Sequence, residues 1–187
     1  MKTKHLFSPK ALIPKFMLIL TAGLGSVSVN ANCSDAITPT AALNNFRVLD
    51  SANEVQDLRS GLIWKRCVVG RSFDKSTASC SGTSGRYDWQ GALQQAEQAA
   101  NNSGLAWRLP SIKELNSIVE HACTPKTNSL FSFPSPVWSG TPYTGFGSQN
   151  RSYLVDFRFG VLFGSRSINN MYEVILVREA PQPSSQI

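Results

Sequence analysis

Few side chains in this sequence of 187 residues have the types and the spacing that catalysis requires. A serine–histidine–aspartate hydrolase would need His121 as its base, but this histidine is predicted at the end of a helix, close to Cys123. Glycoside hydrolysis needs two carboxylates that flank one bond, whereas the acidic residues here are scattered. An oxidase with reactive cysteines in its C-terminal part is not expected, because no cysteine follows Cys123. We therefore predict that the protein is not an enzyme.

The four cysteines, Cys33, Cys67, Cys80 and Cys123, indicate structural disulfides. An even number in an oxidising compartment favours two bonds, and three pairings are possible. We predict Cys67–Cys80 and Cys33–Cys123, because the first pair brackets a loop rich in Gly, Ser and Thr. The sequence has no C-x-x-C motif, and His121 is the one histidine beyond residue 31, so we expect neither a metal site nor another cofactor.

Segment 143–170 carries side chains that suit binding. It is rich in Gly, Ser, Asn, aromatic residues and arginine, and antibody loops combine rigid rings with adaptable polar groups in a similar way. Arg151, Arg158 and Arg166 lie in this segment with a single acid, Asp156. Guanidinium groups bind sulphate or carboxylate through two parallel hydrogen bonds. We therefore predict salt-sensitive, metal-free binding of an acidic glycan or an acidic protein surface.

The elements that must position these side chains are helices in the middle of the chain and strands at both ends. Predicted strands cover residues 46–50, 54–57, 61–67, 137–139, 152–159, 161–163 and 173–178. Residues 70–86 are predicted to be a loop closed by a disulfide. We expect the terminal strands to pair in one small antiparallel sheet, which makes the fold class α+β.

In the strand predicted at 152–159, apolar and polar residues alternate. Tyr153, Val155 and Phe157 occupy one set of positions, and Leu154, Asp156 and Arg158 occupy the other. Successive side chains of a strand point to opposite faces, so this pattern predicts one buried face and one exposed face.

Two helices are predicted between the strands. Asp88 is a suitable N-cap for a helix over 89–101. Ser111 and Glu114 form the S-x-x-E pattern of a capping box at the start of a helix over 112–122, whose apolar residues recur at helical spacing. Arg108, just before this helix, is expected either at the surface or paired with a buried carboxylate.

Residues 1–31 are predicted to be an export signal. Four lysines precede an apolar run from Phe16 to Leu24, which is too short to span a bilayer, and small residues end the segment at Ala31. Without this segment, 156 residues remain as one exported domain, periplasmic, at the cell surface or secreted. Removal of the four lysines lowers the net charge from +6 to +2, so nucleic acid is not an expected partner. No later apolar run is long enough to cross a membrane.

Five motifs, in this order and spacing, resemble the Lcl C-terminal domain family. They are Asp57-x-x-x-Gly61-Leu62-Ile63-Trp64-Lys65-Arg66-Cys67, Trp89-Gln90-x-Ala92-Leu93, Trp107-Arg108-Leu109-Pro110-x-x-Lys113-Glu114-Leu115, Val137-Trp138-Ser139-Gly140 and Val174-Ile175-Leu176-Val177-Arg178. The resemblance implies a C-type lectin-like fold with two helices, a small antiparallel sheet and long loops. The resemblance covers roughly residues 46–178, and we assign the domain to 46–180. A polar arm at 32–45, expected to be held by Cys33, precedes it, and a tail at 181–187, predicted to be disordered, follows it.

Domains of the family that this sequence resembles occur on exported bacterial proteins. One is an adhesin whose terminal domain binds sulphated glycosaminoglycans, and others are variable proteins of diversity-generating retroelements. In the variable proteins, exposed positions of the C-terminal strands face the ligand. The positions implied here, together with neighbours from the arginine-rich segment, are Arg151, Tyr153, Leu154, Asp156, Arg158, Phe159, Phe163, Arg166, Asn169 and Asn170. The Glu-Pro-Asn and Trp-Asn-Asp signatures of calcium-dependent lectins are absent, so calcium-mediated sugar binding is not expected.

These observations predict an exported, non-catalytic binding module with an adhesin-like role. Three alternatives remain open at this point. The ligand could be a protein recognised mainly through aromatic side chains, the segment could be an ordinary sheet edge with scattered exposed rings, or the protein could be a structural subunit of a surface appendage. The four tryptophans, Trp64, Trp89, Trp107 and Trp138, are expected in the core.

Overall fold

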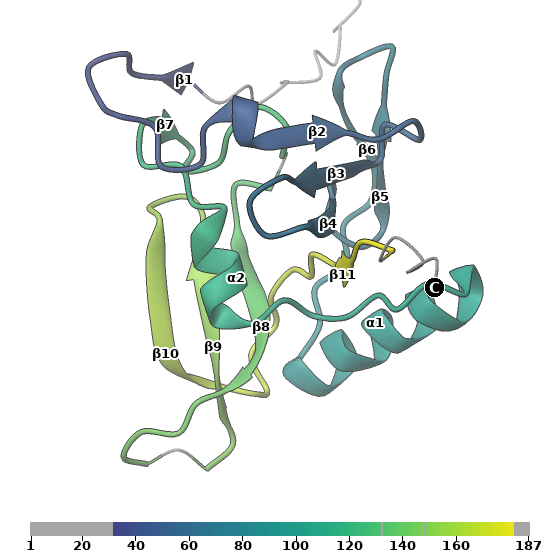
Figure 1. The fold of residues 1–187 in the computed structure, drawn as a ribbon. Coiled ribbons are helices and arrows are strands. Elements are labelled where there is room, and N and C mark those ends of the chain that lie inside the picture. The colour runs from purple at the N-terminus through teal and green to yellow at the C-terminus, as the bar shows by residue number, and fades with distance from the viewer. Residues whose placement is uncertain (1–31, 132, 148, 182–187) are drawn as a thin grey trace, which may run out of the picture.

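A computed structural model describes residues 32–131, 133–147 and 149–181 (Figure 1). The predicted export signal at 1–31, and the predicted tail apart from Pro181, lie outside the described residues. The architecture is α+β, with two α-helices and four antiparallel sheets of two to four strands. No described helix has the length and apolar character needed to cross a membrane.

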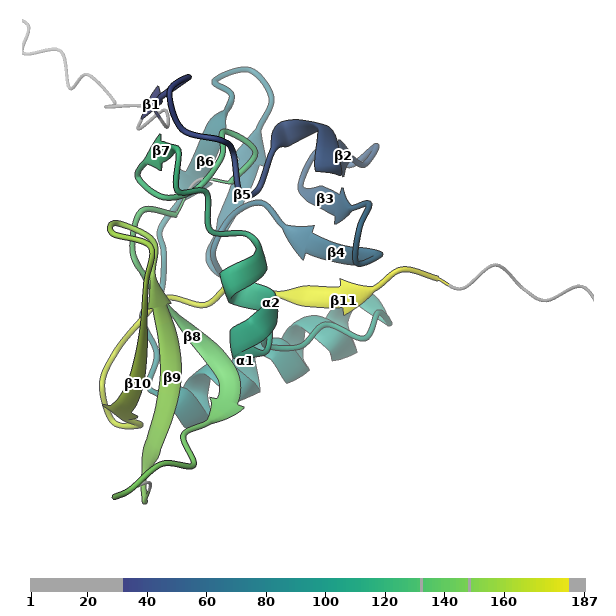
Figure 2. The ribbon, with the colours of Figure 1, turned by 60° about the vertical axis from the view of Figure 1, so that its left-hand side comes forward.

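The largest sheet joins the two ends of the chain, as the sequence predicts. Its strands are β2 (Phe46–Val48), β3 (Glu54–Asp57), β4 (Leu62–Lys65) and β11 (Val177–Glu179), in the order β11-β4-β3-β2. The strands that precede β11 do not join it, which corrects the expectation of one common sheet. They are β8 (Pro136–Pro142), β9 (Arg151–Asp156) and β10 (Val161–Ser167), and they form a separate sheet in the order β10-β9-β8 (Figure 2).

Two small two-stranded pairs complete the strands, one a hairpin and the other formed by segments far apart in the sequence. β5 (Arg71–Asp74) pairs with β6 (Ser79–Gly82) inside the segment that was expected to be a loop, and the expectation was wrong because the serine-rich sequence has no alternating pattern. β1 (Asn32–Cys33) pairs with β7 (Cys123–Thr124) and begins the N-terminal arm, which ends in a 3-10 turn at Leu43–Asn45. The disulfides Cys33–Cys123 and Cys67–Cys80 are both present, so the predicted pairing is confirmed.

Both predicted helices form, but the second is shorter than expected. α1 (Trp89–Ser103) begins at Asp88, whose carboxylate accepts a hydrogen bond of 2.7 Å from the Gly91 amide. α2 (Ile112–Ser117) has the predicted capping box: the Ser111 hydroxyl accepts from the Glu114 amide at 3.3 Å, and the Glu114 carboxylate accepts from the Ser111 amide at 2.7 Å.

The sequence pattern overestimates α2 because Ile118 and Val119 are buried by packing outside the helix. Glu120 follows them, and its carboxylate accepts hydrogen bonds of 2.8–3.0 Å from the amides of Thr40, Ala41 and Ala122. These bonds hold the arm against a non-helical turn. His121 therefore lies four residues beyond the end of the helix and is exposed, which corrects its predicted position at a helix end.

Two apolar cores lie on opposite sides of the β8–β9 pair. The first contains Leu115 and Ile118 from the α2 region with Val137 and Val155. The second contains Ala92 and Ala96 of α1 with the neighbouring sheet residues Trp138 and Leu154. Trp64, Trp107 and Trp138 are buried as predicted, whereas Trp89 is only partly buried and donates its ring N–H to the Ser139 carbonyl at 2.8 Å.

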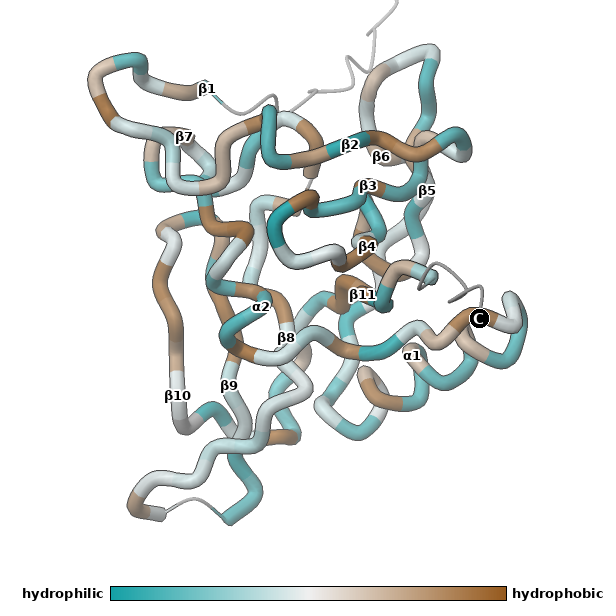
Figure 3. Tube along the Cα trace, viewed as in Figure 1, coloured by the Kyte–Doolittle hydropathy of each residue, from teal (hydrophilic) through white to brown (hydrophobic). Residues whose placement is uncertain are grey.

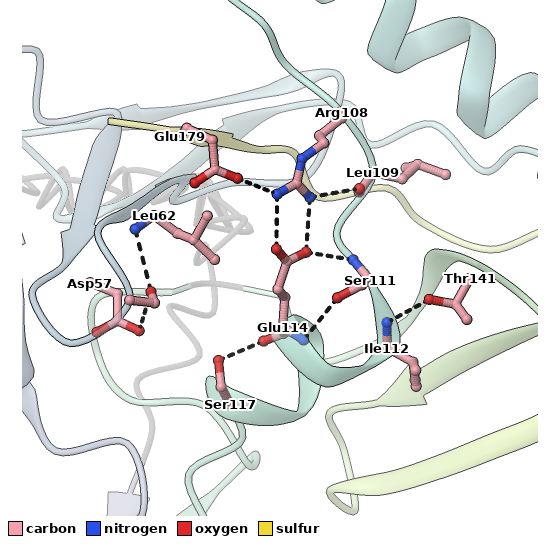
Figure 4. A network of polar contacts seen from close by, with 11 residues as sticks. Asp57, Leu62, Arg108, Leu109, Ser111, Ile112, Glu114, Ser117, Thr141 and Glu179 are labelled. Atoms are coloured by element: carbon pink, nitrogen blue, oxygen red, sulfur yellow. Dashed lines mark hydrogen bonds and ion pairs between the residues drawn. The ribbon is translucent and has the colours of Figure 1, made fainter. Parts of the chain in front are cut away.

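The stretch from Trp107 to Leu115 connects these layers. Arg108 exchanges two backbone hydrogen bonds with Val177 of β11, and the Pro110 carbonyl accepts one from Gly140 of β8. The Arg108 guanidinium also meets the Glu114 carboxylate through two hydrogen bonds of 2.8 Å and Glu179 through one of 2.7 Å (Figure 4). Arg108 does pair with carboxylates, but neither of them is buried as expected: the side chain of Glu114 is 21% exposed and that of Glu179 is 65% exposed.

The capping box gives a direct test of this connection. We expect Ser111→Ala to lower the free energy of unfolding by about 1 kcal/mol, because it removes an N-cap acceptor. Urea titration followed by tryptophan fluorescence measures the change. Ser129→Ala is the matched control, since Ser129 is exposed and has no partner among the described residues. Equal stabilities of the two variants would contradict the assigned role of Ser111.

Candidate functional site

The central strand β9 is buried on both faces, which changes the predicted binding surface. Leu154 is paired with Trp138 on β8 and Phe163 on β10, and it is 1% exposed in the second core. Its neighbour Val155 is buried in the first core. The prediction of an exposed face that includes Leu154 is therefore wrong, because α1 and α2 cover opposite faces of the strand and the alternation has no solvent side.

Asp156 is also buried rather than exposed, and it organises the turn after β9. Its carboxylate accepts hydrogen bonds from the Arg158 amide at 3.0 Å and from Arg158 Nε at 2.9 Å, with Nη2 at 2.5 Å from the second oxygen. Burial acts to raise the pKa of Asp156, but the hydrogen bonds from Arg158 and the charges of Arg158 and Arg166 outweigh it, and the pKa is lowered. Asp156 is thus a support for Arg158 rather than a ligand-facing acid.

The turn between β9 and β10 carries exposed groups. Phe159 is 64% exposed, and the guanidinium carbon of Arg158 lies 5.4 Å from the centre of its ring. Gly160 has φ +67°, and a Cβ at this position would lie 3.2 Å from Lys126 and 3.3 Å from the His121 ring. The turn therefore rests directly on Lys126 and His121, two residues that the sequence did not connect with the site.

Strand β10 is the free edge of its sheet. No described strand pairs with its outer side, and the views in Figures 1 and 2 both show it at the margin of the molecule. Val161 and Leu162 at its start are 41% and 43% exposed, and this part of the strand is hydrophobic in Figure 3. These two residues were not predicted to belong to the binding surface. The uncharged run from Val161 to Ser165 is the sequence signal that could have indicated them.

A bulge in β10 brings Arg166 onto the ring of Phe163. Phe163 pairs with Leu154 and Arg166 pairs with Ser152, so three residue steps on β10 correspond to two on β9. In a regular strand, two side chains three positions apart point to opposite faces. The extra residue of the bulge places Phe163 and Arg166 on the same face. The guanidinium carbon of Arg166 lies 4.3 Å from the centre of the Phe163 ring.

The remaining predicted residues lie around the other end of β10. Tyr153 packs edge-on against Tyr143 with ring centres 5.3 Å apart, and a Cβ at Gly164 would lie 2.9–3.0 Å from both rings. Arg151, Asn169 and Asn170 are exposed, and Asn170 donates to the Tyr172 hydroxyl at 3.4 Å. The tyrosine pair is thus a packing element against β10, with Tyr153 partly buried.

The predicted residues therefore form two groups instead of one pocket. Arg158 and Phe159 lie at the turn, and Arg151 and Arg166 lie at the far end of the hairpin. A strand rises about 3.3 Å per residue, so the backbones of the two groups are roughly 15 Å apart. The Arg166 guanidinium reaches back over Phe163, where its charge still acts on Asp156, so a ligand that contacts Arg151 as well as the turn must be extended along β10.

The described His, Cys, Asp and Glu side chains are not arranged as a metal site. Within residues 32–131, 133–147 and 149–181, no group of three or more His, Cys, Asp or Glu side chains could hold a metal ion. His121 lines a polar pocket of about 440 Å³ with Asp57 and Ser60, but no hydrogen bond joins its ring to either among the described residues. A non-catalytic role stays a prediction.

Comparison with known proteins gives one match. A family profile for the Lcl C-terminal domain matches residues 53–178, which include all three strands of the β8–β10 sheet and both helices. Searches of curated proteins and of solved structures returned no significant match.

The support that Asp156 gives to the turn should depend on pH. The pKa of Asp156 is lower in the folded protein than its value of about 3.8 in the unfolded chain. The ionised carboxylate therefore stabilises the fold fully at pH values above about 3.8, and this contribution is lost as the pH falls through the folded-state pKa. We expect Asp156→Asn to cost about 1–3 kcal/mol near pH 7 and progressively less below about pH 4. Urea unfolding between pH 2 and pH 7 measures this, with the exposed Asp35→Asn as control. A cost that is the same at all pH values would contradict the ionic role.

Proposed function

The chain belongs to the Lcl C-terminal domain family, and on this premise we propose that it is a non-catalytic binding domain for an extended acidic ligand. The ligand lies along β10 and is either an acidic glycan or an acidic protein segment. The role is that of an adhesin-like recognition domain, and contact is made by arginine and aromatic side chains without a metal ion.

The observation that carries this proposal is the position of Arg166 over Phe163. The bulge orients the guanidinium on the ring at 4.3 Å, and no described residue forms a hydrogen bond with it. A guanidinium that is oriented in this way keeps its donors available for sulphate or carboxylate, which accept two parallel hydrogen bonds. A lysine in the same place would not offer this planar pair of donors.

The charges around β10 favour an acidic ligand. Arg158 and Lys126 lie at the turn, and Arg151 and Arg166 lie at the far end. The single acid of the hairpin, Asp156, is buried and forms its hydrogen bonds with Arg158, and its charge also acts on Arg166, so one carboxylate faces four cations around β10. Exposed charge pairs are screened by salt much more than apolar contacts are, and binding should therefore be salt-sensitive.

The two disulfides support an exported location for this domain. Disulfides form and persist in oxidising compartments and are rare in the reducing cytosol. Cys33–Cys123 closes the N-terminal arm onto the body of the domain, and Cys67–Cys80 closes the segment that contains β5 and β6. An exported domain with a basic edge is placed where acidic glycans and acidic protein surfaces are encountered.

Binding to sulphated and neutral oligosaccharides at low and high salt tests the proposal. We expect binding of a heparin oligosaccharide that weakens with salt, is insensitive to chelator and falls about tenfold in Arg166→Gln, because one guanidinium–sulphate contact contributes about 1.5 kcal/mol. Arg71→Gln is the control, since Arg71 is an exposed arginine on β5. Equal binding of neutral oligosaccharides, loss of binding on chelation, or an equal loss in both variants would contradict the proposal.

A further inference from the structure

We propose that the outer edge of β10 accepts an extended peptide with acidic flanks as an additional antiparallel strand. This inference rests on the proposed function, because it specifies which acidic ligand the hairpin binds. It adds a binding mode, in which the backbone of the ligand pairs with the backbone of β10 and the arginines contact its acidic ends.

The outer edge of β10 differs from the other edges of the two larger sheets. The outer edge of β8 is covered by Glu173, whose carbonyl accepts a hydrogen bond from Trp138, and the edge of β11 is covered by Arg108. β2 is three residues long and has the charged Arg47 at its centre. Proteins usually shorten, cover or charge an exposed edge because unpaired amides and carbonyls attract other strands. β10 has seven residues, and no described strand pairs with its outer edge.

The side chains at the start of this edge are apolar and exposed. Val161 and Leu162 point to different faces and are both about two-fifths exposed, and Phe159 beside them is more exposed still. Apolar residues on both faces of a free edge suit a partner strand with β-branched or apolar residues, since paired side chains on adjacent strands contact each other. The first three residues of β10 have regular pairing with β9, so their outer backbone groups are correctly spaced for a further strand.

The charges at the two ends of β10 favour a foreign peptide over a second copy of this chain. Two β10 strands paired antiparallel would place Arg158 and Lys126 of one copy near Arg151 and Arg166 of the other. Parallel pairing would place like charges together as well. Like charges at an interface oppose association, whereas acidic residues at the ends of a foreign strand would meet cations at both ends. The occupant that fits is therefore an acid-flanked peptide with an apolar centre.

The test uses three probes with the purified protein. The first is a peptide Asp-Glu-Ser-Val-Thr-Val-Thr-Val-Ser-Glu-Asp, and the second is the same peptide with every central amide N-methylated, which keeps all charges and side chains. The third is a heparin oligosaccharide. We expect the first peptide to bind at least about tenfold more tightly than the second, because methylation removes several backbone hydrogen bonds. Hydrogen exchange should show new protection in Val161–Ser167 with the first peptide only.

A pair of leucine variants examines the apolar part of the edge. Leu162→Gln should weaken binding of the first peptide about three- to tenfold, since it removes apolar surface that the added strand would cover. Its binding of the oligosaccharide should not change. Leu58→Gln is the matched control, because Leu58 has a similar exposure of 53% and lies in the turn between β3 and β4.

The outcomes separate this inference from the proposed function. Equal binding of both peptides without protection of β10 would overturn strand addition and leave arginine-based binding intact. Failure of all three probes to bind would overturn both. Protection of Val161–Ser167 in the protein alone, rising with its concentration, would show that the occupant is a second copy of the chain and would also overturn the inference.

Discussion

The ion pair between Arg108 and Glu114 ties α2 to the terminal strand β11, alongside the apolar core that both elements share with β8. Glu114 caps α2 through the Ser111 amide, and Arg108 pairs its backbone with Val177 of β11. The hydrogen bonds from Arg108 are the largest cause of the lowered pKa of Glu114, and partial burial opposes them. Glu179 adds a third, more exposed contact, which solvent screens more strongly. The helix and the terminal strand are thus joined by this side-chain cluster, and β8 is joined to the same segment through the backbone carbonyl of Pro110.

A second ionic cluster lies on the other side of the same backbone. Glu54 on β3 receives hydrogen bonds from Lys65 at 2.7 Å and from Arg178 at 2.8 Å, and both cations lie over the Trp107 ring. Burial acts to raise the pKa of Glu54, but the two cations outweigh it and lower the pKa. Trp107 and Arg108 are adjacent residues, so two successive side chains anchor the same extended segment to opposite neighbours. This segment therefore positions the β8–β10 sheet relative to the larger one.

The features that could be predicted from the sequence are those with a short-range cause. The cap of α1, the capping box of α2 and the pairing of Cys67 with Cys80 each depend on a few neighbouring residues. The length of α2 and the exposure of Leu154 depended on what packs against them: Glu120 binds the N-terminal arm, and α1 covers the face of Leu154. The sequence predicted the arginines and aromatic rings of the candidate site. It did not predict that β10 is an edge strand, because strand order is a long-range property that local patterns do not contain.

The burial of β9 on both faces also limits what kind of binding this sheet can provide. Neither face is open across the central strand, so a ligand can reach only the outer strand, the turn and the hairpin end. Such a surface is long and narrow, and it offers backbone groups as well as side chains. The bulge at Phe163–Arg166 ends the regular part of the edge and at the same time turns a cation toward it. The same distortion that limits how far a partner strand can pair therefore supplies the group that would bind its acidic end.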